Sequence, residues 1–120
     1  MITGTKTDSF VKSWTGAWNA HDIDAILNHF SDDVENSAHT VKTYLGVESG
    51  TTKGKESARK LWEMILAQFP DLEFNAVKFW SGTGFITLHW NAKAQNRTFD
   101  GVDTFFFRED GIVSKVVTAR

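Results

Sequence analysis

The residue of this sequence with the clearest capacity for chemistry is Asp103, an acid in the aromatic stretch Gly101 to Gly111, GVDTFFFREDG. Successive residues of a strand point to opposite faces of a sheet, so Asp103 shares one face with Phe99 and Phe105. Burial among aromatic rings disfavours the charged form of a carboxyl group and raises its pKa. The stretch therefore predicts either an acid/base group or a structural acid that is hydrogen-bonded to a Trp N–H or a backbone group.

The other polar residues form no pattern typical of a metal or cofactor site. His21 and His29 lie eight positions apart, which is not the spacing of paired helical metal ligands, and the sequence has no His-x-His pair. His89 alternates with Thr87 and Asn91 on the polar side of a predicted strand, where we expect a surface or interface role. The chain contains no cysteine, no Gly-rich phosphate loop and no nucleophilic serine elbow. We therefore expect chemistry that uses no metal and no cofactor.

A predicted hairpin positions Asp103. Residues 85–94 alternate between apolar and polar, which is typical of a strand with one buried face. If Gln95 and Asn96 form a two-residue turn, Leu88 lies opposite Asp103 and Trp90 lies opposite Gly101. The apolar face of one strand then meets the face of the next strand that carries the acid, so two separate patterns agree on where Asp103 lies.

The remaining elements form helices first and strands afterwards. Apolar residues at spacings of three and four predict helices over about 7–18, 23–30 and 55–69, the last ended by Pro70. We expect strands over 34–40, 41–45, 72–80 and 112–119, and a loop over 46–54. This order predicts an α+β fold with helices packed on one face of a mostly antiparallel sheet.

Composition limits the classes of partner. The 120 residues fit one domain, 1–120, and the net charge of −2 gives no reason to expect nucleic acid or an anionic membrane as a partner. The sequence has no signal-peptide pattern and no apolar run of membrane-spanning length. We therefore expect a cytoplasmic protein. Five Trp and ten Phe are more aromatic residues than a core of this size needs, which permits an apolar cavity or an oligomer interface.

Several motifs resemble those of a known family. They are WTGAWNAHD at 14–22, the Phe30 to Val34 segment FSDDV, KGKE at 53–56, and GVDTFFFREDGIV at 101–113. In this order they resemble the SnoaL-like and ketosteroid isomerase-like branch of the nuclear transport factor 2-like superfamily. The resemblance implies one SnoaL-like domain with a cone-shaped, cystatin-like roll, in which a curved sheet encloses a pocket. It also implies a homodimer that forms through the sheet.

The resemblance suggests roles for particular residues. Asp103 matches an acid that ketosteroid isomerases, the standard case of a carboxylic acid held neutral, use to donate a hydrogen bond to an oxyanion. The family's tyrosine falls at Trp14 and its carboxylate base at Ala38, so both are replaced here. His39, one residue further on, is the candidate base, with a solvent-facing loop histidine as the alternative. The expected walls of the pocket, where a ligand would bind, are Trp14, Trp18, Trp62, Leu88, Trp90, Phe99 and Phe105.

Two functional classes remain open. One is a cofactor-independent isomerase, cyclase or dehydratase that acts on a small hydrophobic ligand with a carbonyl group, through Asp103 and His39. The other is a domain of the same fold that binds a small molecule or a protein without turnover. An epoxide-hydrolase arrangement would need Arg97 between Asp100 and Asp103. However, Asp100 and Asp103 point to opposite faces of the predicted strand, and Arg97 falls at the predicted turn.

Overall fold

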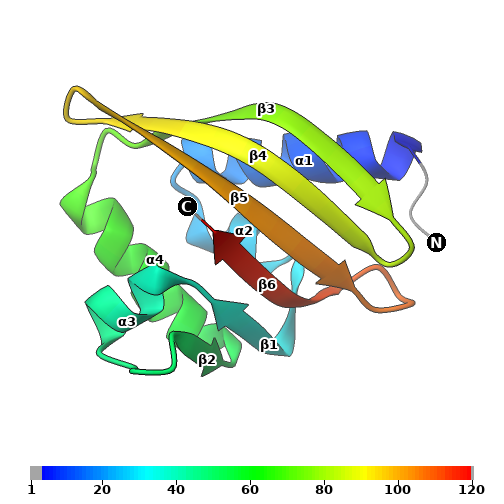
Figure 1. The fold of residues 1–120 in the computed structure, drawn as a ribbon, viewed down its shortest axis with the longest axis horizontal. Helices are drawn as coiled ribbons and strands as arrows, with labels where there is room; N and C mark the ends of the chain where they lie inside the picture. Colours follow the sequence, from blue (N-terminus) through cyan, green and yellow to red (C-terminus); the bar gives the residue numbers. More distant parts are fainter. Residues whose placement is uncertain (1–3, 120) are drawn as a thin grey trace.

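A curved sheet with helices on its concave side makes up the computed structural model, which describes residues 4–119 (Figure 1). The helices are α1 (Gly4–Asn19), α2 (Ile23–Leu27), α3 (His39–Leu45) and α4 (Lys55–Gln68). The strands are β1 (Phe30–Ser37), β2 (Thr51–Lys53), β3 (Glu73–Gly82), β4 (Phe85–Ala94), β5 (Arg97–Phe107) and β6 (Val113–Ala119). The predicted α+β class and the helices expected from about 7 and over 55–69 are confirmed. The helix expected over 23–30 is shorter than predicted, because it ends at Leu27 and Phe30 begins β1. Within residues 4–119, no helix has the length and apolar character needed to cross a membrane.

The strands lie in the order β2-β1-β6-β5-β4-β3. Every neighbouring pair is antiparallel except β1 and β6, which run parallel. The last strand of the chain is therefore inserted between the first strand and β5. In Figure 1 the long strands β3, β4 and β5 sweep over α1, while α3 and α4 lie beside β1 and β2.

The hairpin of β4 and β5 has the predicted register. Leu88 pairs with Asp103 and Trp90 pairs with Gly101. Gln95 and Asn96 form the turn with φ angles of 52° and 61°, the left-handed pair that a two-residue hairpin turn requires. Asp103 consequently lies on the inner face of the sheet.

The segment between β1 and α4 differs from the prediction. Residues 41–45, expected to be a strand, belong to the helix α3, and the expected loop over 46–54 contains the short strand β2. Val41, Tyr44 and Leu45 have helical spacing, but a run of seven residues is too short for its period to be decisive. Gly46, with a φ of 71°, accepts the left-handed conformation that ends this helix.

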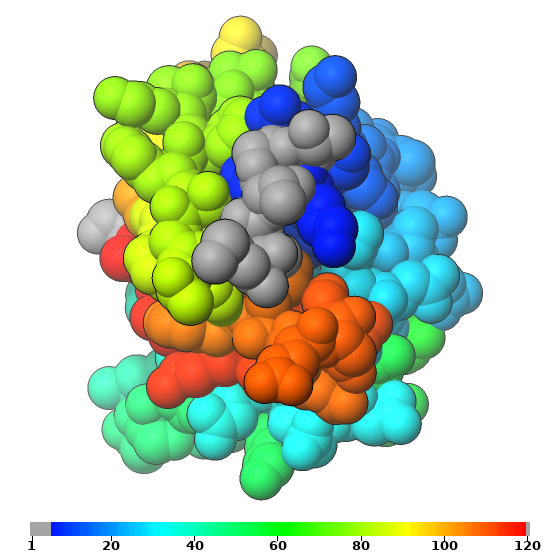
Figure 2. Space-filling view, turned by 90° about the vertical axis from the view of Figure 1, so that its right-hand side faces the viewer, coloured from blue at the N-terminus to red at the C-terminus, as the bar shows by residue number. Residues whose placement is uncertain are grey.

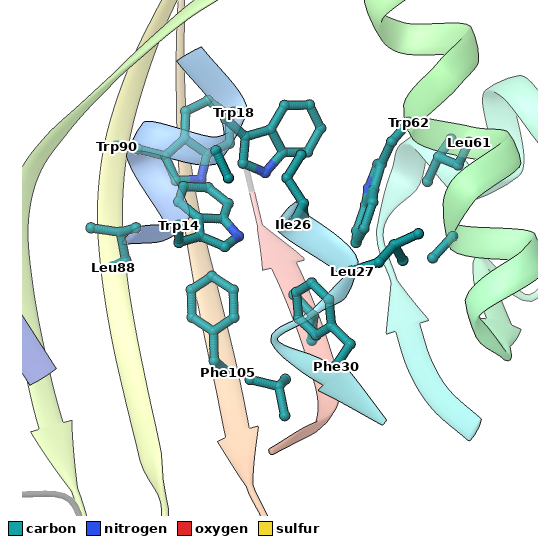
Figure 3. Packing of buried hydrophobic residues seen from close by; sticks show 14 of the residues in the cluster. Trp14, Trp18, Ile26, Leu27, Phe30, Leu61, Trp62, Leu88, Trp90 and Phe105 are labelled. Atoms are coloured by element: carbon teal, nitrogen blue, oxygen red, sulfur yellow. The ribbon is translucent and has the colours of Figure 1, made fainter. Parts of the chain in front are cut away.

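The core lies between the sheet and the helices. Trp14 and Trp18 from α1 meet Phe105 and Trp90 from the sheet, and Trp62 from α4 lies toward Phe30 (Figure 3). At the other end of the sheet, the β5–β6 turn, the β3–β4 turn and the beginning of α1 come together on one face of the molecule (Figure 2). The aromatic core continues toward this end, where Phe10 of α1 packs edge-on against Phe105 and Phe107 of β5.

Candidate functional site

A cavity of about 250 Å³ lies between the inner face of the sheet and the helices α1, α3 and α4. Its walls are mainly aromatic and aliphatic, and only a few polar groups reach them. The lining residues include Trp14, Trp18, Asn36, His39, Tyr44, Trp62, Phe74, Trp90, Phe99, Asp103, Phe105 and Thr118.

Asp103 is the acid of this cavity and is only 6% exposed. β5 presents it inward, and its cross-strand neighbour Thr118 on β6 donates a hydrogen bond of 2.7 Å from Oγ1 to Oδ1 of the carboxyl group. Burial raises the pKa of Asp103 to about 6, although the Thr118 hydroxyl and the Trp90 indole N–H both act in the opposite direction. The carboxyl group can therefore exist in both protonation states near neutral pH.

Trp90 owes its position beside Asp103 to a glycine. A Cβ atom added at Gly101 would lie 2.2 Å from Cζ2 of the Trp90 indole, so only glycine lets the ring lie across β5 at this point. The indole N–H is close enough to affect the carboxyl pKa, but its geometry completes no hydrogen bond, and Nε1 of Trp90 is buried without a partner. The indole N–H therefore lies beside the carboxyl group and favours its ionised form without completing a hydrogen bond to it.

Two further buried donors without partners belong to residues of the cavity wall. They are Nε1 of Trp18 and Nδ2 of Asn36. A buried donor that lacks an acceptor costs about 1 to 3 kcal/mol, so native proteins keep few of them. Their presence at the wall of one cavity is consistent with a ligand that carries acceptor atoms.

His39 is exposed and begins α3 at the outer part of the cavity. Ala38, His39, Thr40 and Thr118 also line a second hollow that adjoins the cavity. Thr118 therefore belongs both to this hollow and to the hydrogen bond with Asp103. The structure brings His39 and Asp103 to the wall of the same cavity, with His39 at the solvent side.

Hydrogen bonds connect the elements around this end of the cavity. The Tyr44 hydroxyl donates to Oε1 of Gln68 at 2.5 Å, which ties α3 to α4. Nε2 of Gln95 donates to the Gln68 carbonyl oxygen at 2.9 Å, and the backbone N–H of Gln95 donates to Asp71. The β4–β5 turn, α4 and α3 are therefore held to one another.

The other histidines do not line the cavity. Nε2 of His21 lies 2.8 Å from the Leu72 carbonyl oxygen, and Nε2 of His29 lies 3.0 Å from the Ser13 hydroxyl. His89 is 3.4 Å from Asp100 on the outer face of the sheet. Among residues 4–119, no three His, Cys, Asp or Glu side chains gather as metal ligands.

Six of the seven expected wall residues line the cavity: Trp14, Trp18, Trp62, Trp90, Phe99 and Phe105. Leu88 does not, and the expectation that it contacts a ligand is corrected. It is fully buried in the core, where it pairs with Asp103 across the strands.

Arg97 and Asp100 are exposed, and Asp100 projects from the opposite face of β5 to Asp103. The arginine and two acids of an epoxide-hydrolase arrangement therefore do not converge. Sequence reasoning missed Thr118, Asn36 and Phe74. Thr118 lies opposite Asp103 only through the register of the assembled sheet. Asn36 is buried on β1, but no alternation of apolar residues around it predicts this burial.

Residues 11–115 match the family model described as a SnoaL-like domain. The chain belongs to the SnoaL-like domain family. A solved SnoaL-like protein of unknown function from Burkholderia thailandensis is 33% identical, with a TM-score of 0.90 over 98% of this chain and 96% of that one. The predicted resemblance to the SnoaL-like and ketosteroid isomerase-like branch is therefore confirmed.

More distant structures share the fold of this SnoaL-like domain. A proposed ketosteroid isomerase from Kribbella flavida is 13% identical, with a TM-score of 0.73 over 93% of this chain and 75% of that chain. The epoxide hydrolase/cyclase-like enzyme SalBIII of pyran ring formation in salinomycin is 16% identical, with a TM-score of 0.76 over 98% of this chain and 92% of that chain. Structures described as nuclear transport factor 2-like and cystatin-fold share it too, so the predicted roll is confirmed. No protein among the curated ones matches the chain.

Proposed function

We propose that this SnoaL-like domain is a cofactor-independent acid/base enzyme of the isomerase, cyclase or dehydratase type, acting on a small hydrophobic ligand with a carbonyl group. The observation that carries the proposal is the Asp103 carboxyl group, which is buried in the wall of an apolar cavity and has a pKa of about 6. A pKa near the working pH is what a general acid or base requires. The fold of the ketosteroid isomerase-like and cyclase-like structures is compatible with such chemistry but does not by itself specify it.

With a pKa of about 6, Asp103 is mainly a carboxylate at pH 7. It can remove a proton from the carbon next to the ligand carbonyl, so that the C–H electron pair forms a C=C bond and the carbonyl electrons move to oxygen. The unpaired N–H of Trp90 is available to that oxygen. If the ligand also carries a C=C bond between its β and γ carbons, the intermediate is a dienolate, and return of the proton from Asp103 to the γ carbon moves the double bond to the α and β carbons. This completes an isomerisation with all atoms of the ligand retained.

His39 is the second acid/base group of the proposal. Below about pH 6, Asp103 becomes neutral and can donate a hydrogen bond to the ligand oxygen, which is the role the family resemblance implies. His39, at the solvent side of the same cavity, can pass protons between the cavity and water. Asp103 is thus the base of the reaction when it is ionised and a hydrogen-bond donor when it is neutral.

The cavity volume favours a compact ligand. An apolar cavity of about 150 Å³ holds a benzene molecule, so 250 Å³ holds about ten carbon-sized atoms, or two fused rings. A four-ring steroid would need about twice that number of atoms.

Exchange of protons on 1-tetralone, a bicyclic ketone, tests the proposal. In D₂O at neutral pH, the protein should accelerate deuterium uptake next to the carbonyl, which NMR follows directly. Asp103→Asn should lower this rate about a hundredfold, the usual contribution of a positioned acid/base group. Asp8→Asn, which changes an exposed acid on α1, is the matched control and should retain the rate.

Equal rates in the wild type and Asp103→Asn would refute the catalytic role. If 1-tetralone raised the melting temperature without any exchange above buffer, the alternative of binding without turnover would replace the enzyme proposal.

We also propose that a second copy of this chain pairs with the outer face of the sheet. Trp80 and Phe106 are 48% and 39% exposed there. Nζ of Lys78 lies 5.2 Å from the centre of the Trp80 ring, and Nζ of Lys115 lies 6.0 Å from the centre of the Phe106 ring. Apolar and charged groups therefore lie side by side on this face. A two-fold contact would bury both rings in each copy. Light scattering should give the mass of a dimer, and that of a monomer for Trp80→Lys; a monomeric wild type would refute this pairing.

A further inference from the structure

We infer that Asn36 forms a second polar subsite of the cavity, which binds an acceptor oxygen of the ligand at a point separate from Asp103. The inference rests on the proposed function, because it describes the same ligand more closely. It adds a chemical requirement: the ligand carries two acceptor oxygens on a compact apolar frame, and one of them accepts a hydrogen bond from the Asn36 amide.

Asn36 lies on the inner face of β1, and β6 separates β1 from β5. It pairs with Val116 of β6, which in turn pairs with Phe105 of β5. Asp103 is the next inward-facing residue of β5. Two strand spacings place the backbone of β1 about 10 Å from that of β5, so side chains from the two strands can contact opposite ends of one bicyclic molecule.

The amide nitrogen of Asn36 has no hydrogen-bond partner in the protein. Asn36 is only 4% exposed, it lines the cavity, and its Nδ2 atom is buried without an acceptor. Phe30, Leu61 and Val116 line the same cavity, so an aliphatic residue would suit this wall better than an amide. A ligand oxygen within reach of Nδ2 would supply the acceptor that the protein does not.

The neighbouring strand offers a matched comparison. Thr52 of β2 pairs directly with Asn36, and its buried hydroxyl also lacks a partner, but Thr52 does not line the cavity. Thr52→Val and Asn36→Leu therefore each remove one unpaired polar group from the same region of the sheet. Only Asn36→Leu changes the cavity wall.

Two bicyclic probes that differ by one carbonyl oxygen test the subsite. They are N-methylphthalimide, with two carbonyl groups, and N-methylisoindolin-1-one, with one. Calorimetric titration of both probes into the wild type, Asn36→Leu, Thr52→Val and Asp103→Leu gives the affinity ratio for each variant. We expect the wild type to prefer the two-carbonyl probe, and Asn36→Leu to reduce this preference about fivefold, the usual value of one neutral hydrogen bond. Thr52→Val should leave it unchanged.

Thermal unfolding provides the second measurement. Replacing an unpaired buried amide by an apolar group of similar size should leave the melting temperature of Asn36→Leu unchanged or raise it. A melting temperature well below that of the wild type, together with an unchanged affinity ratio, would mean that the amide is structural and would overturn the inference. An unchanged ratio in a stable Asn36→Leu variant would overturn it as well.

Failure of the inference and failure of the proposed function give different results. If the affinity for the one-carbonyl probe depends on Asp103 but the preference does not depend on Asn36, only the second subsite is refuted. If neither probe binds the wild type, the cavity does not take compact carbonyl ligands, and both the subsite and the proposed function are refuted.

Discussion

The buried carboxyl group of Asp103 predicts an unusual dependence of stability on pH. Its pKa is about 6 in the folded protein and 3.8 for the ordinary side chain, a rise of roughly 2 units. At about 1.4 kcal/mol for each unit, the ionised carboxyl group destabilises the folded state by about 3 kcal/mol. Because the folded-state pKa is raised, this cost is absent below pH 4, grows between about pH 4 and pH 6, and is complete above pH 6.

Asp103→Asn removes the charge but keeps a carbonyl oxygen that can accept the hydrogen bond from Thr118. We therefore expect this substitution to be nearly neutral for stability at pH 4 and stabilising by about 3 kcal/mol at pH 8. For a domain of this size that corresponds to a rise in melting temperature of about 10 °C.

Urea unfolding of both proteins at intervals from pH 4 to pH 8 measures the difference in the free energy of unfolding. Asp8→Asn, which alters an exposed acid, should show no comparable growth with pH. A difference between wild type and Asp103→Asn that stays constant over this range would refute the argument that the carboxyl group is desolvated. So would an Asp103→Asn variant less stable than the wild type at pH 8.

The close contact between Gly101 and Trp90 makes a second prediction. Gly101→Ala should destabilise the fold by about 1 to 3 kcal/mol and change the tryptophan fluorescence, because the added Cβ would overlap the Trp90 ring. The control Gly16→Ala, on the exposed side of α1 with nothing within 4 Å, should stabilise the fold by about 0.5 to 1 kcal/mol, and equal effects of the two substitutions in urea unfolding would contradict the close packing. Thr118→Val should raise the pKa of Asp103 above 6, because a hydrogen-bond donor to the carboxylate is lost. An NMR titration that follows the carboxyl carbon of Asp103 should therefore have its midpoint at a higher pH than in the wild type; an unchanged or lower midpoint would contradict this. His39→Gln should change stability by less than about 0.5 kcal/mol, because the side chain is exposed. It should slow tetralone exchange at neutral pH, because a group that passes protons to water is lost; an exchange rate equal to that of the wild type would contradict a role for His39.

The position of Asp103 could be predicted because three local signals agree. The alternation of β4, the alternation of β5 and the two-residue turn at Gln95 and Asn96 fix one register, and the structure has that register. Each signal acts over a few residues and depends on no distant contact. The packing of Trp90 against Gly101 follows from the same register, although its closeness requires the side-chain positions.

The parts that could not be predicted depend on contacts between distant segments. β6 has no clear alternation, so nothing local identifies Thr118 as the partner of Asp103, fifteen positions away. Asn36 is polar, and a polar residue at an inward position breaks the pattern that would reveal the inner face of β1. α3 is seven residues long, too short to distinguish helix from strand by period, yet it supplies His39 and Tyr44 to the cavity.

The insertion of β6 between β1 and β5 has a consequence for the order of folding. Of the strands, β6 is the last in the sequence, yet it joins β1 to the β3–β4–β5 meander and supplies Thr118 to the carboxyl group. Before β6 docks, two sheet edges are unpaired and the cavity lacks one wall. A cavity ligand can therefore recognise only the completed fold, and it stabilises that state by mass action without assisting earlier intermediates.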